Sequence, residues 1–109
     1  MKKNYRFCLK DILEAANLIE KFVRGMRFED FLEDKKTSSA VIRQFEIIGE
    51  AVKSIPAEIQ KQHEGIPWKE IAGMRDRLIH QYMKVDDRVV WDSIQMLPEI
   101  KRVIKKILR

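Results

Sequence analysis

The chain has 109 residues, enough for one domain with a hydrophobic core and too few for two. It contains 22 Lys and Arg against 17 Asp and Glu, and the formal net charge of +5 is compatible with an anionic partner such as RNA. Cys8 is the only cysteine, which excludes an internal disulfide and a cysteine-based metal site and fits a reducing cytoplasm.

Apolar residues at the start of the chain recur at steps of three and four, which predicts one helix with a single buried stripe. They are Tyr5, Cys8, Leu9, Ile12, Ala15, Ala16, Ile19, Phe22 and Val23. We expect Asn4 to cap this helix and Gly25 to end it. The segment FEDFLED (28–34) predicts a short turn of helix, and KKTSS (35–39) a linker.

A second long helix is expected from Ala40 to Ile55, where the apolar positions step alternately by four and three, as in a coiled-coil seam. Gly49 lies inside this helix at a cost of about 1 kcal/mol relative to alanine. A close approach of another helix would justify that cost. Pro56 ends the helix. Residues 57–67 predict a polar connection with room for one helical turn.

The third long helix is expected to begin near Pro67 and to run to about Met83. A last helix follows, capped by Asp86 or Asp87 and extending to the C-terminus. Its apolar stripe stays in phase across Pro98, so the sequence predicts a kink there rather than a break.

Four main helices joined by mostly short links predict an all-α fold. The expected architecture is an up-down four-helix bundle with one additional short helix, formed by residues 1–109 as a single domain. No run of about 18 uncharged apolar residues occurs, so we expect no membrane span. The start, MKKNYRFCLKD, lacks the apolar run of a signal peptide.

Arg75 is the unusual residue of the third long helix. At 100° per residue it projects about 40° from Ile71, inside the apolar sector that also contains Tyr82. Burying an unpaired charge costs several kcal/mol, so Arg75 needs an acidic partner or a cleft. One interpretation is therefore a buried, purely structural ion pair with Glu46 or Glu50 on the preceding helix.

His80 points the other way. It projects about 140° from Arg75, on the outer side of the helix, with Asp76 one turn before it. One straight helix does not bring the tips of Arg75 and His80 together. A twofold dimer that packs two copies of this helix could combine them in one cleft.

The stretch RDRLIHQY (75–82) has the pattern Arg, four residues, His, one residue, Tyr. Upstream lies FEIIGEAVKSIP (45–56), and around it lies WKEIAGMRDRLIHQYMKVDDRVVWDSIQMLPEI (68–100). Together these segments resemble HepT-like toxins of the HEPN superfamily, and the chain shows no departure at a motif position. The first helix is also compatible with that resemblance.

The resemblance implies a homodimeric, HEPN-like helical bundle that acts as a metal-independent ribonuclease with no cofactor. It also implies a cognate nucleotidyltransferase antitoxin as partner. Carried over to this sequence, Arg75 and His80 are the catalytic pair, and Tyr82 is the residue that the antitoxin modifies with AMP from ATP. Asp76 is a candidate orienter of His80 or of the substrate, although a local salt bridge explains it equally well.

The chemistry of these residues suits RNA cleavage. A histidine near neutral pKa can take a proton from a ribose 2′-OH or give one to the leaving 5′-oxygen. An arginine can bind the phosphate and stabilise its developing charge. The main alternative is a non-catalytic, nucleotide-binding subunit of a minimal nucleotidyltransferase complex. A plain helical dimerisation module is a third possibility, but it does not explain why Arg75 and Tyr82 lie in the apolar sector.

Overall fold

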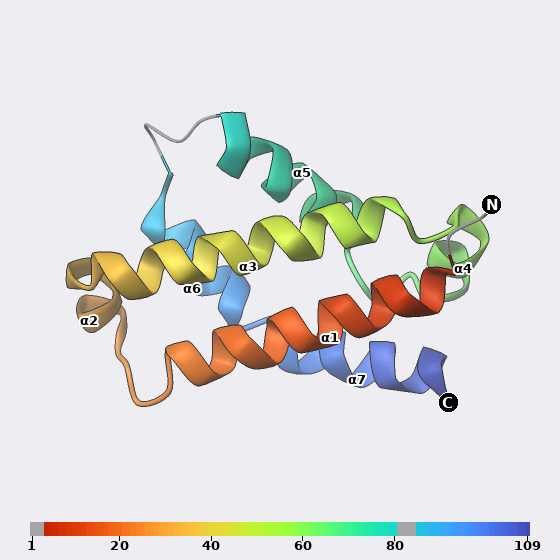
Figure 1. Ribbon diagram of the computed structural model, residues 1–109, viewed down its shortest axis with the longest axis horizontal. Helices are drawn as coiled ribbons and strands as arrows, with labels where there is room; N and C mark the ends of the chain where they lie inside the picture. Colours follow the sequence, from red (N-terminus) through yellow and green to blue (C-terminus); the bar gives the residue numbers. More distant parts are fainter. Residues whose placement is uncertain (1–3, 81–84) are drawn as a thin grey trace.

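Seven helices make up the part of the chain that the computed structural model describes, residues 4–80 and 85–109 (Figure 1). They are α1 (Tyr5–Phe22), α2 (Phe28–Glu33), α3 (Lys35–Lys53), α4 (Ala57–Gln62), α5 (Trp68–His80), α6 (Asp87–Ile94) and α7 (Leu97–Leu108). These described residues contain no strand, so the predicted all-α class is confirmed. None of their helices is long and apolar enough to cross a bilayer.

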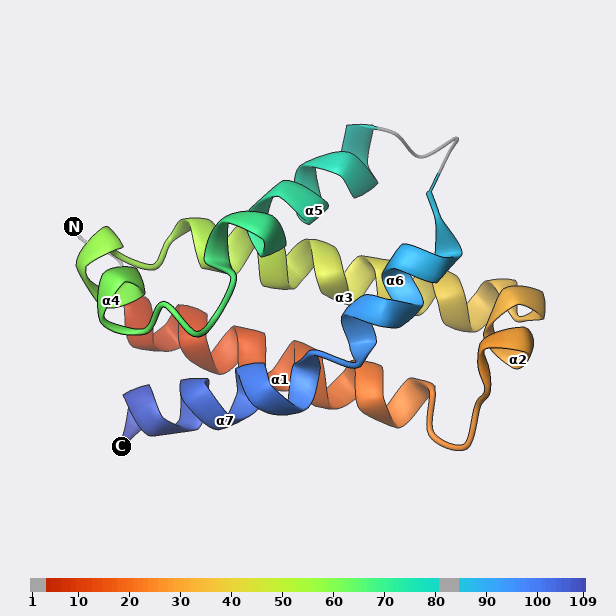
Figure 2. The same cartoon turned by 180° about the vertical axis from the view of Figure 1, so that it is seen from behind.

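The α3 helix is the central element of the fold. It packs against α1 on one side and α5 on the other, and α7 covers a second face of α1 (Figures 1 and 2). Consecutive long helices run in alternating directions, as expected for an up-down arrangement. The short helix α2 lies against α3 and α6 at one end of the molecule. The motif helix α5 is thus held mainly by α3.

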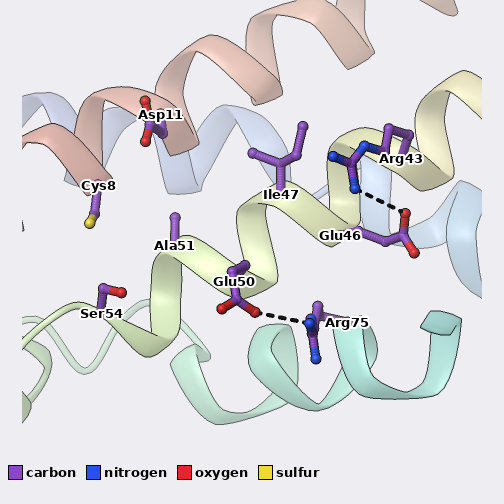
Figure 3. Close-up of a pocket in the computed structure, with 9 residues that line it drawn as sticks. All are labelled: Cys8, Asp11, Arg43, Glu46, Ile47, Glu50, Ala51, Ser54 and Arg75. Atoms are coloured by element: carbon purple, nitrogen blue, oxygen red, sulfur yellow. Dashed lines mark ion pairs between the residues drawn. The ribbon is translucent and has the colours of Figure 1, made fainter. Parts of the chain in front are cut away.

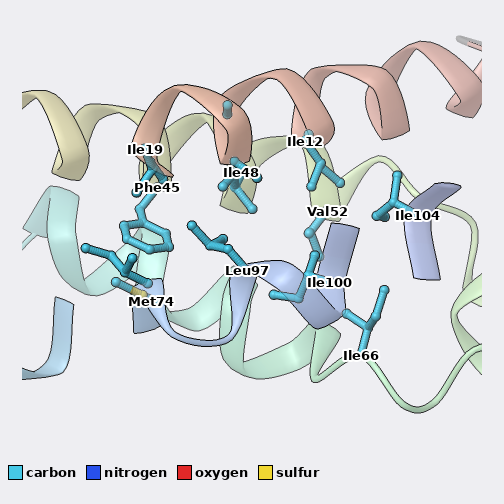
Figure 4. Close-up of a cluster of buried hydrophobic side chains, with 14 of the residues drawn as sticks. Ile12, Ile19, Phe45, Ile48, Val52, Ile66, Met74, Leu97, Ile100 and Ile104 are labelled. Atoms are coloured by element: carbon cyan, nitrogen blue, oxygen red, sulfur yellow. The ribbon is translucent and has the colours of Figure 1, made fainter. Parts of the chain in front are cut away.

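The hydrophobic core lies between these helices and joins their apolar stripes (Figure 4). Its buried side chains include Ile12, Ile19, Phe45, Ile48, Val52, Ile66, Met74, Leu97, Ile100 and Ile104. Burying one such side chain contributes about 1.5–3 kcal/mol. Trp68, at the start of α5, is also buried, and its indole Nε1 donates to the backbone oxygen of His63 at 2.9 Å. The core and this hydrogen bond fix where α5 begins.

The first half of the chain follows the sequence prediction except at the linker. Asn4 caps α1 as expected, and Gly25 adopts φ +80° in the turn that follows the helix. The predicted linker at 35–39 is wrong, because these residues form the first turn of α3. The cause is Asp34, whose carboxylate accepts hydrogen bonds from the backbone nitrogen and the hydroxyl of Thr37. The Ser and Thr residues therefore belong to the helix that Asp34 caps.

The C-terminal region differs from the prediction at Pro98. Asp86 caps α6 as expected, but α6 ends at Ile94 and α7 begins at Leu97. The predicted kink is therefore wrong, and the last helix is two helices. Pro98 lies in the first turn of α7, where a missing backbone N–H removes no intrahelical hydrogen bond. The predicted helical turn within 57–67 is confirmed by α4. The predicted end of the motif helix near Met83 lies outside the described residues.

Candidate active site

Gly49 brings α3 and α5 into unusually close contact. A Cβ atom placed on Gly49 would lie 2.1 Å from the Arg75 Cβ, 2.8 Å from its Cγ and 3.2 Å from the Ile71 carbonyl oxygen. Neither a Cβ nor a backbone carbonyl can move aside easily at such distances. The close approach inferred from the sequence is therefore confirmed. It places the base of the Arg75 side chain directly over the α3 backbone.

Two carboxylates contact the Arg75 guanidinium. Its Nη2 lies 3.1 Å from Glu50 Oε2 (Figure 3). Its Nη1 donates to Asp76 Oδ1 at 3.0 Å. The Arg75 side chain is 25% exposed and that of Glu50 64% exposed. An ion pair with an α3 acid was correctly predicted, but the pair is only partly buried, because the Glu50 carboxylate is on the solvent side. The alternative acid, Glu46, pairs instead with Arg43 at 3.7 Å.

Lys53 contacts the same Asp76 oxygen as Arg75 does. Its Nζ donates to Asp76 Oδ1 at 2.7 Å, so α3 contacts α5 through charges at both Glu50 and Lys53. The hydrogen bonds from Lys53 and then from Arg75 lower the pKa of Asp76 below its ordinary value. Asp76 therefore stays ionised at neutral pH. The network of Lys53, Asp76, Arg75 and Glu50 balances two positive charges with two negative ones.

A polar cavity of ≈ 270 Å³ lies beside this network, between α1, α3 and α5 (Figure 3). Its lining residues are Cys8, Asp11, Arg43, Glu46, Ile47, Glu50, Ala51, Ser54 and Arg75. Its α3 wall carries one arginine, Arg43, and two acids, Glu46 and Glu50. Among the motif residues whose side chains the structure describes, Arg75 is the one in this lining, and its guanidinium is accessible to a small anionic group entering the cavity.

The structure brings together only part of the predicted site. Arg75 and Asp76 are in direct contact, which is the local salt bridge given as the alternative explanation for Asp76, and its role as an orienter of His80 or of the substrate stays a prediction. His80 is the last residue of α5, but its side chain and all of Tyr82 lie outside the described part of the chain. The roles predicted for these two residues stay predictions. In residues 4–80 and 85–109, no group of three or more His, Cys, Asp or Glu is placed to hold a metal ion.

Two residues of the network were not fully predicted from the sequence. Lys53 was missed altogether, although it lies one turn after Gly49 and so on the same face of α3. Glu50 was named only as one of two alternatives. The signal that separates it from Glu46 is its position directly after the glycine at which the two helices meet.

The helical scaffold, with an arginine held at the wall of a polar cavity, defines the class: an all-α domain with a candidate anion-binding site. The model of the HepT-like ribonuclease family matches residues 12–107, and the chain belongs to this family. The HEPN-like fold expected from the resemblance is thereby confirmed.

Relatives with curated names support this assignment. A Thermococcus cleftensis protein named "Probable ribonuclease HepT" is 51% identical over 108 residues, which cover 98% of each chain. A Caldanaerobacter subterraneus protein is 44% identical over 98% of this chain and 96% of its own. A Methanocaldococcus jannaschii protein is 45% identical over 99% of this chain and 90% of its own. The names of the last two both contain the designation RNase. No solved structure matches the chain.

Proposed function

We propose that this protein is a metal-independent endoribonuclease that acts in the cytoplasm as the toxin of a toxin–antitoxin system. The observation that carries the proposal is the place of Arg75. The chain belongs to a ribonuclease family. The arginine of its Arg-x4-His motif lies at the wall of a polar cavity and is held by Glu50 and Asp76. A fixed guanidinium at an accessible wall is suited to bind a phosphodiester.

The proposed reaction is a transesterification within the RNA strand. The ribose 2′-oxygen attacks the adjacent phosphorus, and the bond from phosphorus to the 5′-oxygen breaks. The products are a 2′,3′-cyclic phosphate and a free 5′-hydroxyl. His80 takes the proton from the 2′-OH or supplies one to the leaving oxygen, while Arg75 stabilises the charge on the phosphate.

Cleavage should persist in EDTA. The reaction needs only proton transfer and charge stabilisation, both of which side chains provide. Purified protein should therefore cut single-stranded RNA in excess EDTA and leave 2′,3′-cyclic phosphate ends, detected by mass spectrometry of the fragments. Arg75→Ala, purified in parallel, controls for a contaminating nuclease. Strict dependence on an added divalent ion would rule out this mechanism. Absence of cleavage under all conditions would favour the non-catalytic partner subunit.

The proposed active form is a homodimer. Arg75 and His80 are five residues apart in the sequence, and helical periodicity predicts that they project about 140° apart and do not meet on one straight helix. A second copy could complete the cleft across a twofold axis. Light scattering at micromolar concentration should give twice the mass of one chain, 13.0 kDa. A monomer that cleaves RNA would show that one copy suffices.

The proposed regulator is a nucleotidyltransferase antitoxin that transfers AMP from ATP to Tyr82. Each AMP unit adds a negative phosphate and a bulky nucleoside, and the phosphate can pair with Arg75 while the adenosine blocks RNA. Tyr82→Phe should therefore keep its cleavage activity but escape silencing when both proteins are co-expressed. Intact-mass measurement should show AMP on the wild-type chain and none on the variant.

The chain offers a matched control, because Tyr5 is its only other tyrosine. Tyr5 lies in the first turn of α1 and is partly buried against the core. Tyr5→Phe should still accept AMP and still be silenced. An adduct that persists on Tyr82→Phe would place the modification on another residue and contradict this part of the proposal.

A further inference from the structure

Three residues on one face of α3 determine where Arg75 lies. Gly49, Glu50 and Lys53 all contact the segment of α5 that contains Arg75 and Asp76. Gly49 sets the distance between the helices. Lys53 holds Asp76, and Asp76 in turn binds the guanidinium Nη1. Glu50 is the one residue of the three that contacts the guanidinium itself, at Nη2.

The carboxylates of Glu50 and Asp76 contact the guanidinium at its two terminal nitrogens. An arginine side chain has several rotatable bonds, so a single ion pair would leave the plane of the guanidinium free to turn. Contacts to both Nη1 and Nη2 remove that freedom. A guanidinium has five N–H groups, and two contacts leave others available for a phosphate. Asp76 alone fixes one nitrogen, so the orientation of the plane depends on Glu50.

Glu50 also affects the charge at the cavity. It is one of the acids in the lining, and each acid there repels an incoming phosphate. Glu50 therefore acts in two ways: its charge weakens the binding of RNA, while its contact with Nη2 orients the arginine for cleavage. A residue that only stabilised the fold would have neither effect.

We propose that Glu50 is a positioning residue, whose carboxylate holds the Arg75 guanidinium in the orientation that engages the scissile phosphate. This inference rests on the proposed ribonuclease function and names a further residue of the same site. Glu50 contacts neither the reacting atoms nor a proton in transfer. It acts through Arg75, at the expense of some affinity for RNA.

The test compares Glu50→Ala, Glu50→Gln and Glu46→Ala with the wild-type chain. Glu46 is a matched control, because it lines the same cavity from the same helix but pairs with Arg43. RNA affinity is measured as Kd for a 2′-O-methyl RNA, which lacks the attacking hydroxyl and cannot be cleaved. The value of kcat is measured on the corresponding unmodified RNA.

In Glu50→Ala, kcat should fall about tenfold, less than the roughly 100-fold cost of a 1 Å misplacement. Its Kd should fall by about two- to fivefold, the range for a solvent-exposed charge. Glu50→Gln should show the same fall in Kd but retain most of kcat, because its amide oxygen still accepts from Nη2. Glu46→Ala removes a charge from the same cavity and should lower Kd by a similar factor, but its kcat should fall by much less than the tenfold expected for Glu50→Ala.

Two results would overturn the inference. One is a Glu50→Ala variant with wild-type kcat. The other is a Glu46→Ala variant that loses kcat as Glu50→Ala does, since the effect would then be one of cavity charge. Thermal unfolding of each variant detects a loss of folded protein, which would lower kcat without tightening the binding of RNA.

A second measurement separates this inference from the proposed function. The Nε–H signal of Arg75 in an NMR spectrum is assigned by its loss in Arg75→Lys. It should shift in Glu50→Ala and stay in place in Glu46→Ala. If the wild-type chain cuts no RNA, the proposed function fails, while a shifted signal still upholds the positioning of Arg75 by Glu50. An unchanged signal in Glu50→Ala overturns the positioning, whatever the activity.

Discussion

Arg75→Ala should lower kcat for RNA cleavage by about 100- to 1000-fold, the usual effect of removing one donor that stabilises transition-state charge. The free energy of unfolding should change by only about 1 kcal/mol or less, because the carboxylates that lose their partner, Glu50 and Asp76, are 64% and 48% exposed and ion pairs at the surface contribute little. His80→Ala should lower kcat by about 100-fold or more through loss of proton transfer. Cleavage kinetics and thermal unfolding, measured on the same preparations, check both expectations.

The two measurements distinguish a catalytic from a structural arginine. A buried ion pair that lost one partner would cost about 3–5 kcal/mol. An Arg75→Ala variant that unfolds far earlier than the wild type and still cuts RNA would therefore support the structural interpretation. Arg75→Lys is a useful companion, because it keeps the positive charge but loses the planar guanidinium. Compared with Arg75→Ala, Arg75→Lys should regain more of the wild-type affinity for RNA than of the wild-type kcat.

Gly49→Ala should impair both the fold and the activity. The added Cβ would meet the Arg75 Cβ at 2.1 Å, so α5 must move away from α3. Overpacking of this kind costs about 1–3 kcal/mol. The same movement shifts Arg75 relative to its α3 partners, and a displacement near 1 Å lowers the rate by about 100-fold. Urea unfolding gives the first effect, and cleavage kinetics at a temperature where the variant is folded give the second.

Gly73 supplies the control for stability. It also lies within a helix, but no neighbouring atom of the described residues approaches within 4 Å of the position its Cβ would take. Gly73→Ala should therefore stabilise the protein by about 0.5–1 kcal/mol, the usual gain when alanine replaces glycine inside a helix. Equal stability of Gly49→Ala and the wild type would show that the helices can separate without cost. The contact between α3 and α5 would then not determine where Arg75 lies.

Most of the fold could be predicted because the apolar stripes are regular. Each long helix buries a stripe that is visible as steps of three and four, and Asn4, Pro56 and Asp86 mark ends by local chemistry. The break between α6 and α7 could not be predicted in this way. The apolar residues on the two sides stay in phase, so periodicity alone cannot distinguish a kinked helix from two helices with Pro98 in a first turn.

The candidate site was predictable only within one helix. The Arg-x4-His-x-Tyr pattern and the anomalous place of Arg75 are properties of a single segment, and Gly49 signalled a close contact somewhere. Which residues meet across that contact depends on the rotation and shift of α5 against α3. Those two quantities select Glu50 over Glu46 and bring Lys53 to Asp76. Within α3, only the nearness of Glu50 and Lys53 to Gly49 indicates the choice, and it does not say which α5 residues they meet.

The guanidinium of Arg6 donates from Nη2 to the Leu108 carbonyl oxygen at 2.6 Å, so the beginning of α1 and the end of α7 lie side by side (Figure 2). The last carbonyls of a helix have no partner within it, and Arg6 satisfies one of them. This adjacency makes the chain a candidate for circular permutation. A short linker could join the end of α7 to the start of α1 at little entropic cost, and new chain ends could be opened in the turn at Gly25. Such a rearranged chain would keep α3 and α5 continuous, and with them the contact on which Arg75 depends.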